Sequence, residues 1–161
     1  MRLFEHPDGI EIGEGRHVVY DVSTDSAFLG AVKVNDPAIL WELDDPGPGH
    51  LVRCDRVDFP PGGVAHRHVH PGPGIRRILH GALTIDRGDG DPQTYRAGES
   101  WHEGADDPVL ATASASEHTA FVRVMVLPAE WAGRRTIRYV DPSDEDRPRL
   151  QRASVLLEEA L

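Results

Sequence analysis

The sequence predicts an all-β protein, a sandwich or barrel of short strands with little helix. Thirteen prolines and sixteen glycines divide the 161 residues into short segments, which leaves little room for long helices. Between these breakers, runs rich in valine, isoleucine, leucine and aromatic residues recur at near-regular spacing and are bounded by turn residues. Many short strands with turn signals between them are typical of antiparallel sandwiches and barrels.

The expected strands cover most of the chain up to residue 127. They are residues 16–21, 27–34, 38–43, 50–59, 64–70, 75–79, 82–86, 98–103, 109–113 and 119–127. Residues 120–127 are apolar on both faces, which predicts a central strand buried on both sides. Residues 148–161 fit a short helix, but the run 153–157 fits a strand equally well, and the pattern does not separate the two.

Composition and charge limit the classes of function. A chain of 161 residues, 39% apolar and 27% charged, predicts a single globular domain over residues 1–161. The net charge of −10 argues against nucleic acid and anionic membranes as partners, because both attract basic surfaces. The single cysteine, Cys54, excludes an intrachain disulfide and a multi-cysteine metal site. The first residues lack an apolar signal-peptide core and no run is long enough to span a bilayer, so we expect a cytoplasmic protein.

Three histidines at alternate positions, His66, His68 and His70, are the most informative feature of the sequence. Alternate residues of a strand point to the same face with Cα atoms about 6.7 Å apart, so two neighbouring imidazoles can converge on one metal ion. The outer two lie about 13 Å apart on an extended strand, so at most two of the three are expected to share a metal. The alternative is a surface strand with incidental histidines.

The segment around these histidines resembles the first motif of the cupin superfamily, in which Gly, His-x-His, Glu and Gly follow one another at set spacings. The corresponding residues here are Gly62, His68, His70, Gly74 and Gly81, and a second, weaker motif begins over residues 95–101. The resemblance covers about residues 50–128. It implies a jelly-roll barrel (a double-stranded β-helix) with its site in the barrel mouth. Short terminal extensions flank this core, the C-terminal one over about residues 129–161.

Two of the family's four metal ligands match this sequence. His68 and His70 stand in place, whereas Gly74 stands where the family has glutamate, and the position of the last histidine falls near Val109. The resemblance implies one divalent transition metal, Fe, Ni, Zn, Mn or Cu, held by His68 and His70.

The third metal ligand is expected from a histidine outside this pair. His66 lies on the same predicted strand face as His68, and His102 lies in the strand of the second motif. Water would complete such a site, since imidazole suits Zn, Fe, Ni or Cu. His102 also fits an ordinary half-buried histidine of the barrel wall.

Two further residues are candidates for substrate binding. Arg76 lies two residues beyond Gly74 and is expected to face the cavity, where a buried guanidinium needs an anionic partner. That partner is either a small organic anion or a protein acid such as Glu99 or Asp106. Because glycine replaces the family's glutamate, we expect extra space and a more positive cavity beside Arg76. Trp101 fits either a pocket wall or the core.

These features favour a metal-dependent enzyme that acts on a small organic anion, of the oxygenase or the isomerase/cyclase type. The alternative is a non-catalytic cupin that binds or senses a small molecule and has a degenerate metal site. A homodimer is also expected, because small cupins commonly cover the edges of their open sheets with a partner subunit.

Overall fold

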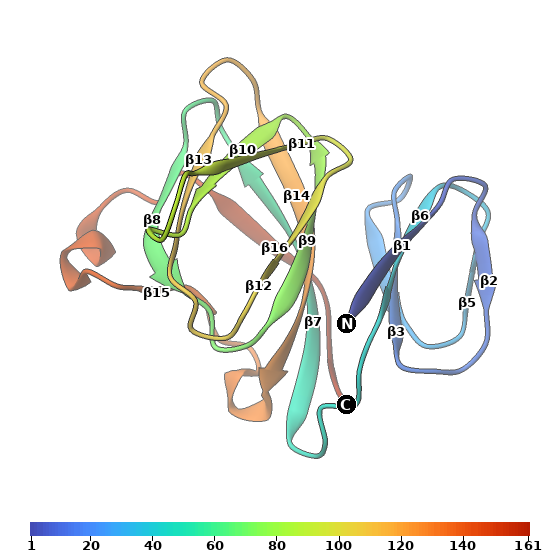
Figure 1. Cartoon of the computed structure of the whole chain (residues 1–161). Coiled ribbons are helices and arrows are strands. Elements are labelled where there is room, and N and C mark those ends of the chain that lie inside the picture. The colour runs from blue at the N-terminus through green and yellow to red at the C-terminus, as the bar shows by residue number, and fades with distance from the viewer.

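The computed structural model describes all residues, 1–161, and confirms the all-β prediction (Figure 1). The only helical segments are two short 3-10 turns, η1 (Ala129–Trp131) and η2 (Pro142–Asp146). The strands form a barrel of two five-stranded sheets and a smaller group of N-terminal strands beside it. No helix has the length and apolar character needed to cross a membrane.

The barrel consists of two antiparallel sheets that face each other. The first has the order β11 (Gln93–Arg96), β10 (Ala82–Asp86), β13 (Val109–Ala113), β8 (Val64–Val69) and β15 (Arg138–Tyr139). The second has the order β12 (Ser100–Glu103), β9 (Gly74–His80), β14 (Thr119–Pro128), β7 (His50–Phe59) and β16 (Arg152–Ala160). From β7 onward the chain crosses between the sheets at almost every connection, which is the jelly-roll arrangement implied by the sequence motifs.

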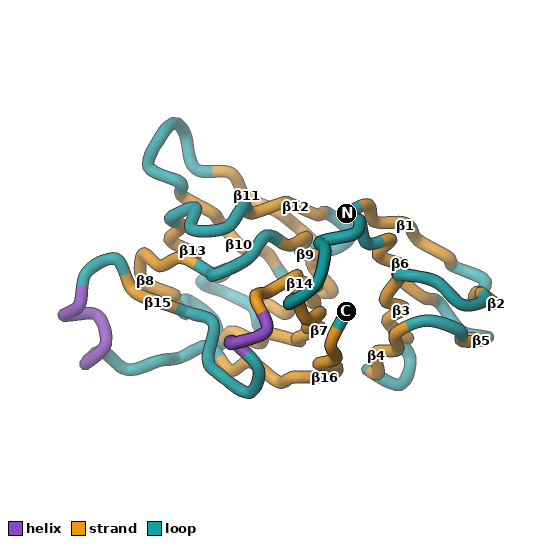
Figure 2. The backbone as a smooth tube through the Cα atoms, turned by 90° about the horizontal axis from the view of Figure 1, so that it is seen from below, coloured by secondary structure: helices purple, strands orange, loops and turns teal.

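The first 43 residues form two smaller sheets at the side of the barrel. One has the order β1 (Arg2–His6), β6 (Ala38–Glu42), β3 (His17–Asp21) and β4 (Ser26–Leu29), and the other pairs β2 (Ile10–Ile12) with β5 (Val32–Val34). The strand expected over residues 27–34 is divided in two, because Gly30 has a φ of 79° and turns the chain there. Both ribbon views place these strands next to β7 and β16 (Figures 1 and 2).

The N-terminal strands pack directly on the outside of the barrel. Outward-facing side chains of β7 and β14 share one apolar cluster with buried residues of β3 and β6 and with Leu43. The buried members of this cluster are Val18, Tyr20, Ile39, Trp41, Leu43, Val52, Cys54, Val122 and Val124. The cluster explains why the strand around residues 120–127 is buried on both faces, as its sequence predicts: one face lines the barrel interior and the other meets the N-terminal sheet.

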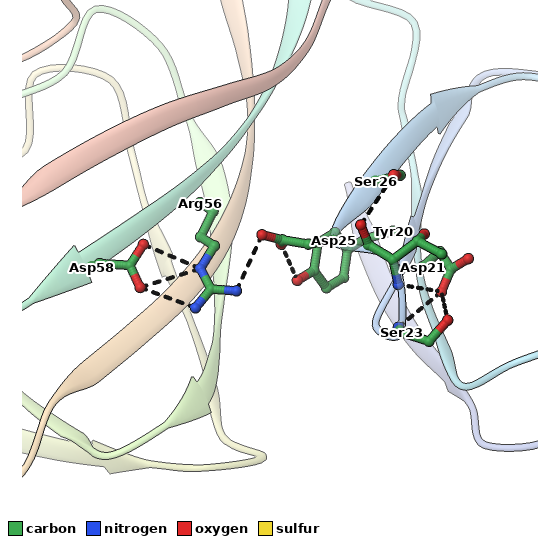
Figure 3. Close-up of polar contacts among 8 residues, drawn as sticks. Tyr20, Asp21, Ser23, Asp25, Ser26, Arg56 and Asp58 are labelled. Atoms are coloured by element: carbon green, nitrogen blue, oxygen red, sulfur yellow. Dashed lines mark hydrogen bonds and ion pairs between the residues drawn. The ribbon is translucent and has the colours of Figure 1, made fainter.

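A chain of polar contacts links the same two parts of the molecule (Figure 3). Arg56, on β7, forms an ion pair with Asp58 at 3.0 Å and another with Asp25 of the N-terminal sheet at 3.2 Å. The hydroxyl of Tyr20 donates to Asp25 at 2.5 Å. These contacts orient the β3–β4 turn against the barrel wall.

The C-terminal extension resolves the ambiguity in the sequence in favour of a strand. β16 runs antiparallel to β7 from the pair Arg152 and Asp58 to the pair Ala160 and Leu51, with a bulge between Val155 and Leu157. The strand therefore covers an edge of β7 that would otherwise present unpaired backbone groups. Local sequence could not decide this, because the partner strand lies about a hundred residues earlier in the chain.

Replacement of Trp41 tests whether the N-terminal sheet and the barrel fold as one unit. Trp41 is fully buried in the cluster that joins them, so Trp41→Ala is expected to lower the free energy of unfolding by about 3–5 kcal/mol. Trp41→Phe should cost less, because it keeps most of the apolar volume and removes an indole N–H that has no hydrogen-bond partner. Urea unfolding of Trp41→Ala, followed by circular dichroism, should show one transition, and a separate early transition would contradict this expectation.

Candidate functional site

The barrel encloses one large cavity of about 560 Å³ between its two sheets. This volume lies within the range of small-molecule binding sites. One part of its lining is apolar: Val57, Phe59, Ala65, Leu83, Ile85, Trp101, Val109, Ala111 and Phe121. The other part is polar: Arg53, Asp55, His68, His70, Arg76, Glu103, Arg123, Thr136 and Glu158.

Strand alternation separates these two parts along the barrel. The side chains of β7 that line the cavity are, in order, Arg53, Asp55, Val57 and Phe59. On the neighbouring strand β14, Phe121 lies opposite Val57 and Arg123 lies opposite Asp55. The cavity therefore has an apolar end and a charged layer. On both strands, the first residue of one part lies two positions along the chain from the first residue of the other.

The charged layer is built on a row of four side chains across the second sheet. Arg123 lies opposite both Asp55 on β7 and Arg76 on β9, and its Nε and Nη2 atoms donate to Asp55 Oδ2 at 3.0 and 2.8 Å. Arg76 pairs with Glu103 of β12, with 2.8 Å between Nη2 and Oε2. The row thus has an acid at each end and two cations side by side in the middle.

Burial controls the electrostatics of this row. Arg76 is only 1% exposed, and burial lowers its pKa to about 10, with the nearby Arg123 adding to the effect and Glu103 opposing it. Burial also works against ionisation of Glu103, but Arg76 and the Trp101 indole outweigh it and hold the pKa of this carboxyl below its ordinary value. Both groups are therefore charged at neutral pH, and burial makes the charged form of Arg76 less favourable than it would be in water.

His68 and His70 are both buried in the charged layer, with 5.0 Å between their ring centroids. His68 Nδ1 lies 2.7 Å from the carbonyl oxygen of His66, so this nitrogen carries the proton and Nε2 is free to accept. His70 Nε2 lies 3.2 Å from Nη1 of Arg123 and accepts a hydrogen bond from it. Burial lowers the pKa of His68 to about 4, and burial together with Arg123 and Arg76 lowers the pKa of His70.

His66 does not join this pair, contrary to the expectation from simple alternation. The pairing of β8 with β13 matches His68 to Val109 and Ala65 to Ala111, so the register shifts at this point. The irregularity adds a residue to β8, which leaves Ala65 and His68 lining the cavity and His66 outside it. A bulge of this kind cannot be located from the alternation of residue types.

His102 also lies outside the cavity, while its two neighbours line it. Trp101 and Glu103 are buried on the inner face of β12, and His102 is exposed on the outer face. The Trp101 indole donates to Glu103 at 2.7 Å, and its ring packs edge-on against Phe121. Trp101 is therefore a wall of the apolar end of the cavity.

The space expected at Gly74 is not present. A Cβ atom at this position would lie 2.4 Å from the carbonyl oxygen of Val124, so the neighbouring strand fills the place of any side chain. The carboxylate expected to be missing is supplied instead by Glu103, which lies directly opposite Gly74. Glu103 is also the ion-pair partner of Arg76, in place of Glu99 or Asp106, and the cavity is less positive than the sequence suggested.

The C-terminal extension lies over one side of the cavity mouth, where it contacts Arg53 of β7. The guanidinium of Arg53 donates to Glu158 at 2.5 Å and to the carbonyl oxygens of Arg134 at 2.7 Å and Trp131 at 2.9 Å. Three arginines of the extension itself also line the cavity: Arg134, Arg135 and Arg149. Because the last two share a single carboxylate, Glu145, the mouth carries a local excess of positive charge.

The barrel matches a known family. Residues 55–119 fit the family model described as a cupin domain. These residues are the part of the barrel that matches a cupin domain. The matched range includes His68 and His70, which line the cavity of the jelly-roll framework.

Solved structures with a similar barrel include three from bacteria. The polyketide cyclase RemF from Streptomyces resistomycificus is 19% identical, with a TM-score of 0.46 over 66% of this chain and 74% of its own. A cupin-like protein from Thermotoga maritima is 17% identical, with a TM-score of 0.46 over 58% and 69%. The DMSP lyase DddQ from Ruegeria pomeroyi is 18% identical, with a TM-score of 0.48 over 56% and 44%, so this chain spans less than half of it. A sequence search of curated proteins found no match.

Cupins generally bind a transition metal, but the side chains of this cavity do not fit one. No three His, Cys, Asp or Glu side chains are grouped closely enough to hold a metal ion. Val109 lies opposite His68 and lines the cavity where the family's last histidine was expected. Arg123 engages the lone pair on Nε2 of His70, and Nδ1 of His70 is buried without a hydrogen-bond partner. In His68 the lone pair on Nε2 has no donor.

The sequence does not reveal the buried ion pair between Asp55 and Arg123. The expected strands 50–59 and 119–127 contain Asp55 and Arg123, but the sequence motifs do not mark either residue as part of the cavity. A charged residue in the middle of an otherwise apolar, doubly buried strand is itself a signal, because a buried charge requires a partner. Arg123 within residues 120–127 is such a case.

The stability of the protein should fall on mild acidification, because His68 and His70 are neutral in the folded state. Unfolded histidines titrate near pH 6.5, so between that pH and about 4 the unfolded chain binds more protons and is favoured. We expect His68 alone to account for a loss of about 2–3 kcal/mol over this window. Urea unfolding between pH 7 and 4 should show a shallower loss for His68→Gln than for the wild type. Parallel profiles would contradict the assignment.

Proposed function

We propose that the cavity binds a small organic anion, with the acidic group of the ligand at the Arg76–Arg123 pair. The observation that carries this proposal is the position of two buried guanidinium groups directly opposite each other on adjacent strands, both lining the cavity. Like charges placed in this way repel each other, and an anion between them relieves the repulsion. In addition, Nη2 of Arg76 has no aligned hydrogen-bond acceptor in the protein, although it lies beside Glu103.

The apolar end of the cavity suits the body of such a ligand. Trp101 and Phe121 pack edge-on with 5.4 Å between ring centroids and offer aromatic surface beyond the charged layer. A flat or ring-shaped apolar group can contact this surface while its carboxylate or enolate oxygen faces the arginines. The positive mouth formed with Arg134 attracts the anion despite the net charge of −10, because salt screens distant charges over about 8 Å.

For the chemistry, an isomerase- or cyclase-type reaction by proton transfer is the best-supported choice. His68 keeps an unprotonated Nε2 in the charged layer, so it can accept a proton from a bound substrate. The arginine pair would stabilise the enolate that forms when a proton leaves carbon next to a carboxylate or carbonyl group. An oxygenase would require a metal on His68 and His70, and a sensing cupin would use the same cavity without turnover.

Ligand binding should depend on Arg76 and not on Arg77, the next residue in the chain. Arg76→Ala is expected to weaken the binding of benzoate by about 2–5 kcal/mol, the range for truncation of one partner of a buried charge pair. Arg77→Ala is the matched control, because Arg77 lies next in the chain, does not line the cavity and pairs with Glu5. Isothermal titration calorimetry measures both variants, and equal losses would count against the proposed anion site.

Proton transfer can be separated from binding in a second measurement. Phenylpyruvate, an aromatic 2-oxo acid, should exchange its C3 protons with deuterated solvent faster in the presence of the protein, as followed by proton NMR. His68→Asn should abolish the enzyme-dependent exchange while benzoate still binds. Binding without any exchange in the wild type would favour the non-catalytic alternative.

A further inference from the structure

We propose that the guanidinium of Arg123 occupies the position of the metal ion in this cupin, so that a fixed organic cation replaces a resident metal. The proposal concerns the barrel itself and does not depend on which anion the cavity binds. It starts from the disagreement between the family motif, which keeps His68 and His70, and a cavity that offers these histidines no further ligands.

Arg123 forms a hydrogen bond with His70. Nη1 of Arg123 lies 3.2 Å from Nε2 of His70, and a guanidinium can only donate, so it uses the imidazole lone pair with which a metal would bond. His70 is 4% exposed, so its ring is held inside the barrel. A metal ion could bind Nε2 of His70 only after Arg123 had left.

Asp55 and Thr136 hold Arg123 in place in addition to His70. Asp55 accepts from its Nε and Nη2 atoms, and Thr136 Oγ1, from the C-terminal extension, lies 3.4 Å from Nη2. All of these residues are buried. The guanidinium is therefore a fixed part of the site, and it engages Oδ2 of Asp55, whereas Oδ1 of the same carboxylate is buried without a hydrogen-bond partner.

The other side chains around His68 are apolar or already paired. Val109, directly opposite on β13, supplies an apolar side chain, and Glu103 is committed to Arg76 and to the indole of Trp101. A divalent ion beside His68 would face two guanidinium groups, and the two nearby carboxylates, Asp55 and Glu103, already form ion pairs with them. The charge that a metal would contribute to binding an anionic ligand is already provided by Arg123 and Arg76.

The first test needs no substitution. Wild-type protein purified without a polyhistidine tag is analysed by plasma mass spectrometry after incubation with Co²⁺ and removal of free ion, and its visible absorption is recorded. We expect the wild type to show no visible absorption band of bound Co²⁺ that is lost in His70→Ala. A stoichiometric metal that is lost in His70→Ala would overturn the proposal.

The second test asks whether Arg123 is the group that excludes the metal. Val109→His offers a third imidazole opposite His68, and it is made alone and together with Asp55→Asn and Arg123→Met, which remove the charge pair without leaving a lone buried charge. We expect the triple variant to bind Co²⁺ on the order of ten- to a hundredfold more tightly than Val109→His alone. Equal affinities would show that Arg123 does not hold the metal position.

The matched control removes the other charge pair of the same row. Val109→His with Arg76→Met and Glu103→Gln loses the same two charges but leaves the contact between Arg123 and His70 in place. We expect this variant to bind Co²⁺ no better than Val109→His alone. A gain equal to that of the first triple variant would assign the effect to net charge and would contradict a specific role for Arg123.

Discussion

The row of four buried charges across β7, β14, β9 and β12 is the constraint on which the rest of the site depends. Transfer of an ion from water to a protein interior is costly unless a partner and hydrogen bonds compensate for it. Asp55 and Glu103 provide that compensation at the two ends of the row, and Arg123 and Arg76 remain side by side between them. The pairs can form only if all four strands keep their register, and the two adjacent cations leave the cavity attractive to an anion.

The extensions on either side of the barrel make this row possible. On β7 and β14, one face carries the cavity residues and the other carries Val52, Cys54, Val122 and Val124, which pack on the N-terminal sheet. Without that sheet, the strands that hold Asp55 and Arg123 would have one face in water. The C-terminal extension adds β16 along the free edge of β7 and pins its connecting segment to Arg53 at the mouth. Both extensions therefore stabilise the strands that bear the charged layer.

The chemistry of the cavity follows from what surrounds the two motif histidines. In a metal site, neutral imidazoles act as ligands and carboxylates balance the charge of the ion. Here the imidazoles are neutral because they are buried beside arginines, and the carboxylates balance guanidinium groups. Such a site retains a positive centre for an anionic ligand, but the cation belongs to the chain and cannot be removed by a chelator. With the proposed anion bound, the two guanidinium groups would stabilise negative charge that develops on it.

Patterns local in the sequence were enough to predict the all-β class, the strands from residue 50 to residue 127 except β11 (Gln93–Arg96), and the inward position of His68, His70 and Arg76. Alternation and turn residues act over a few positions, so they can be recognised without knowing the fold. The tertiary structure alone decided the rest. The bulge in β8 removed His66 from the cavity, the register of β12 against β9 placed Glu103 opposite Gly74, and β16 became a strand because β7 offered an open edge. The sequence also could not show that Arg123 meets His70, since the two are 53 residues apart and only the pairing of strands brings a guanidinium to that imidazole.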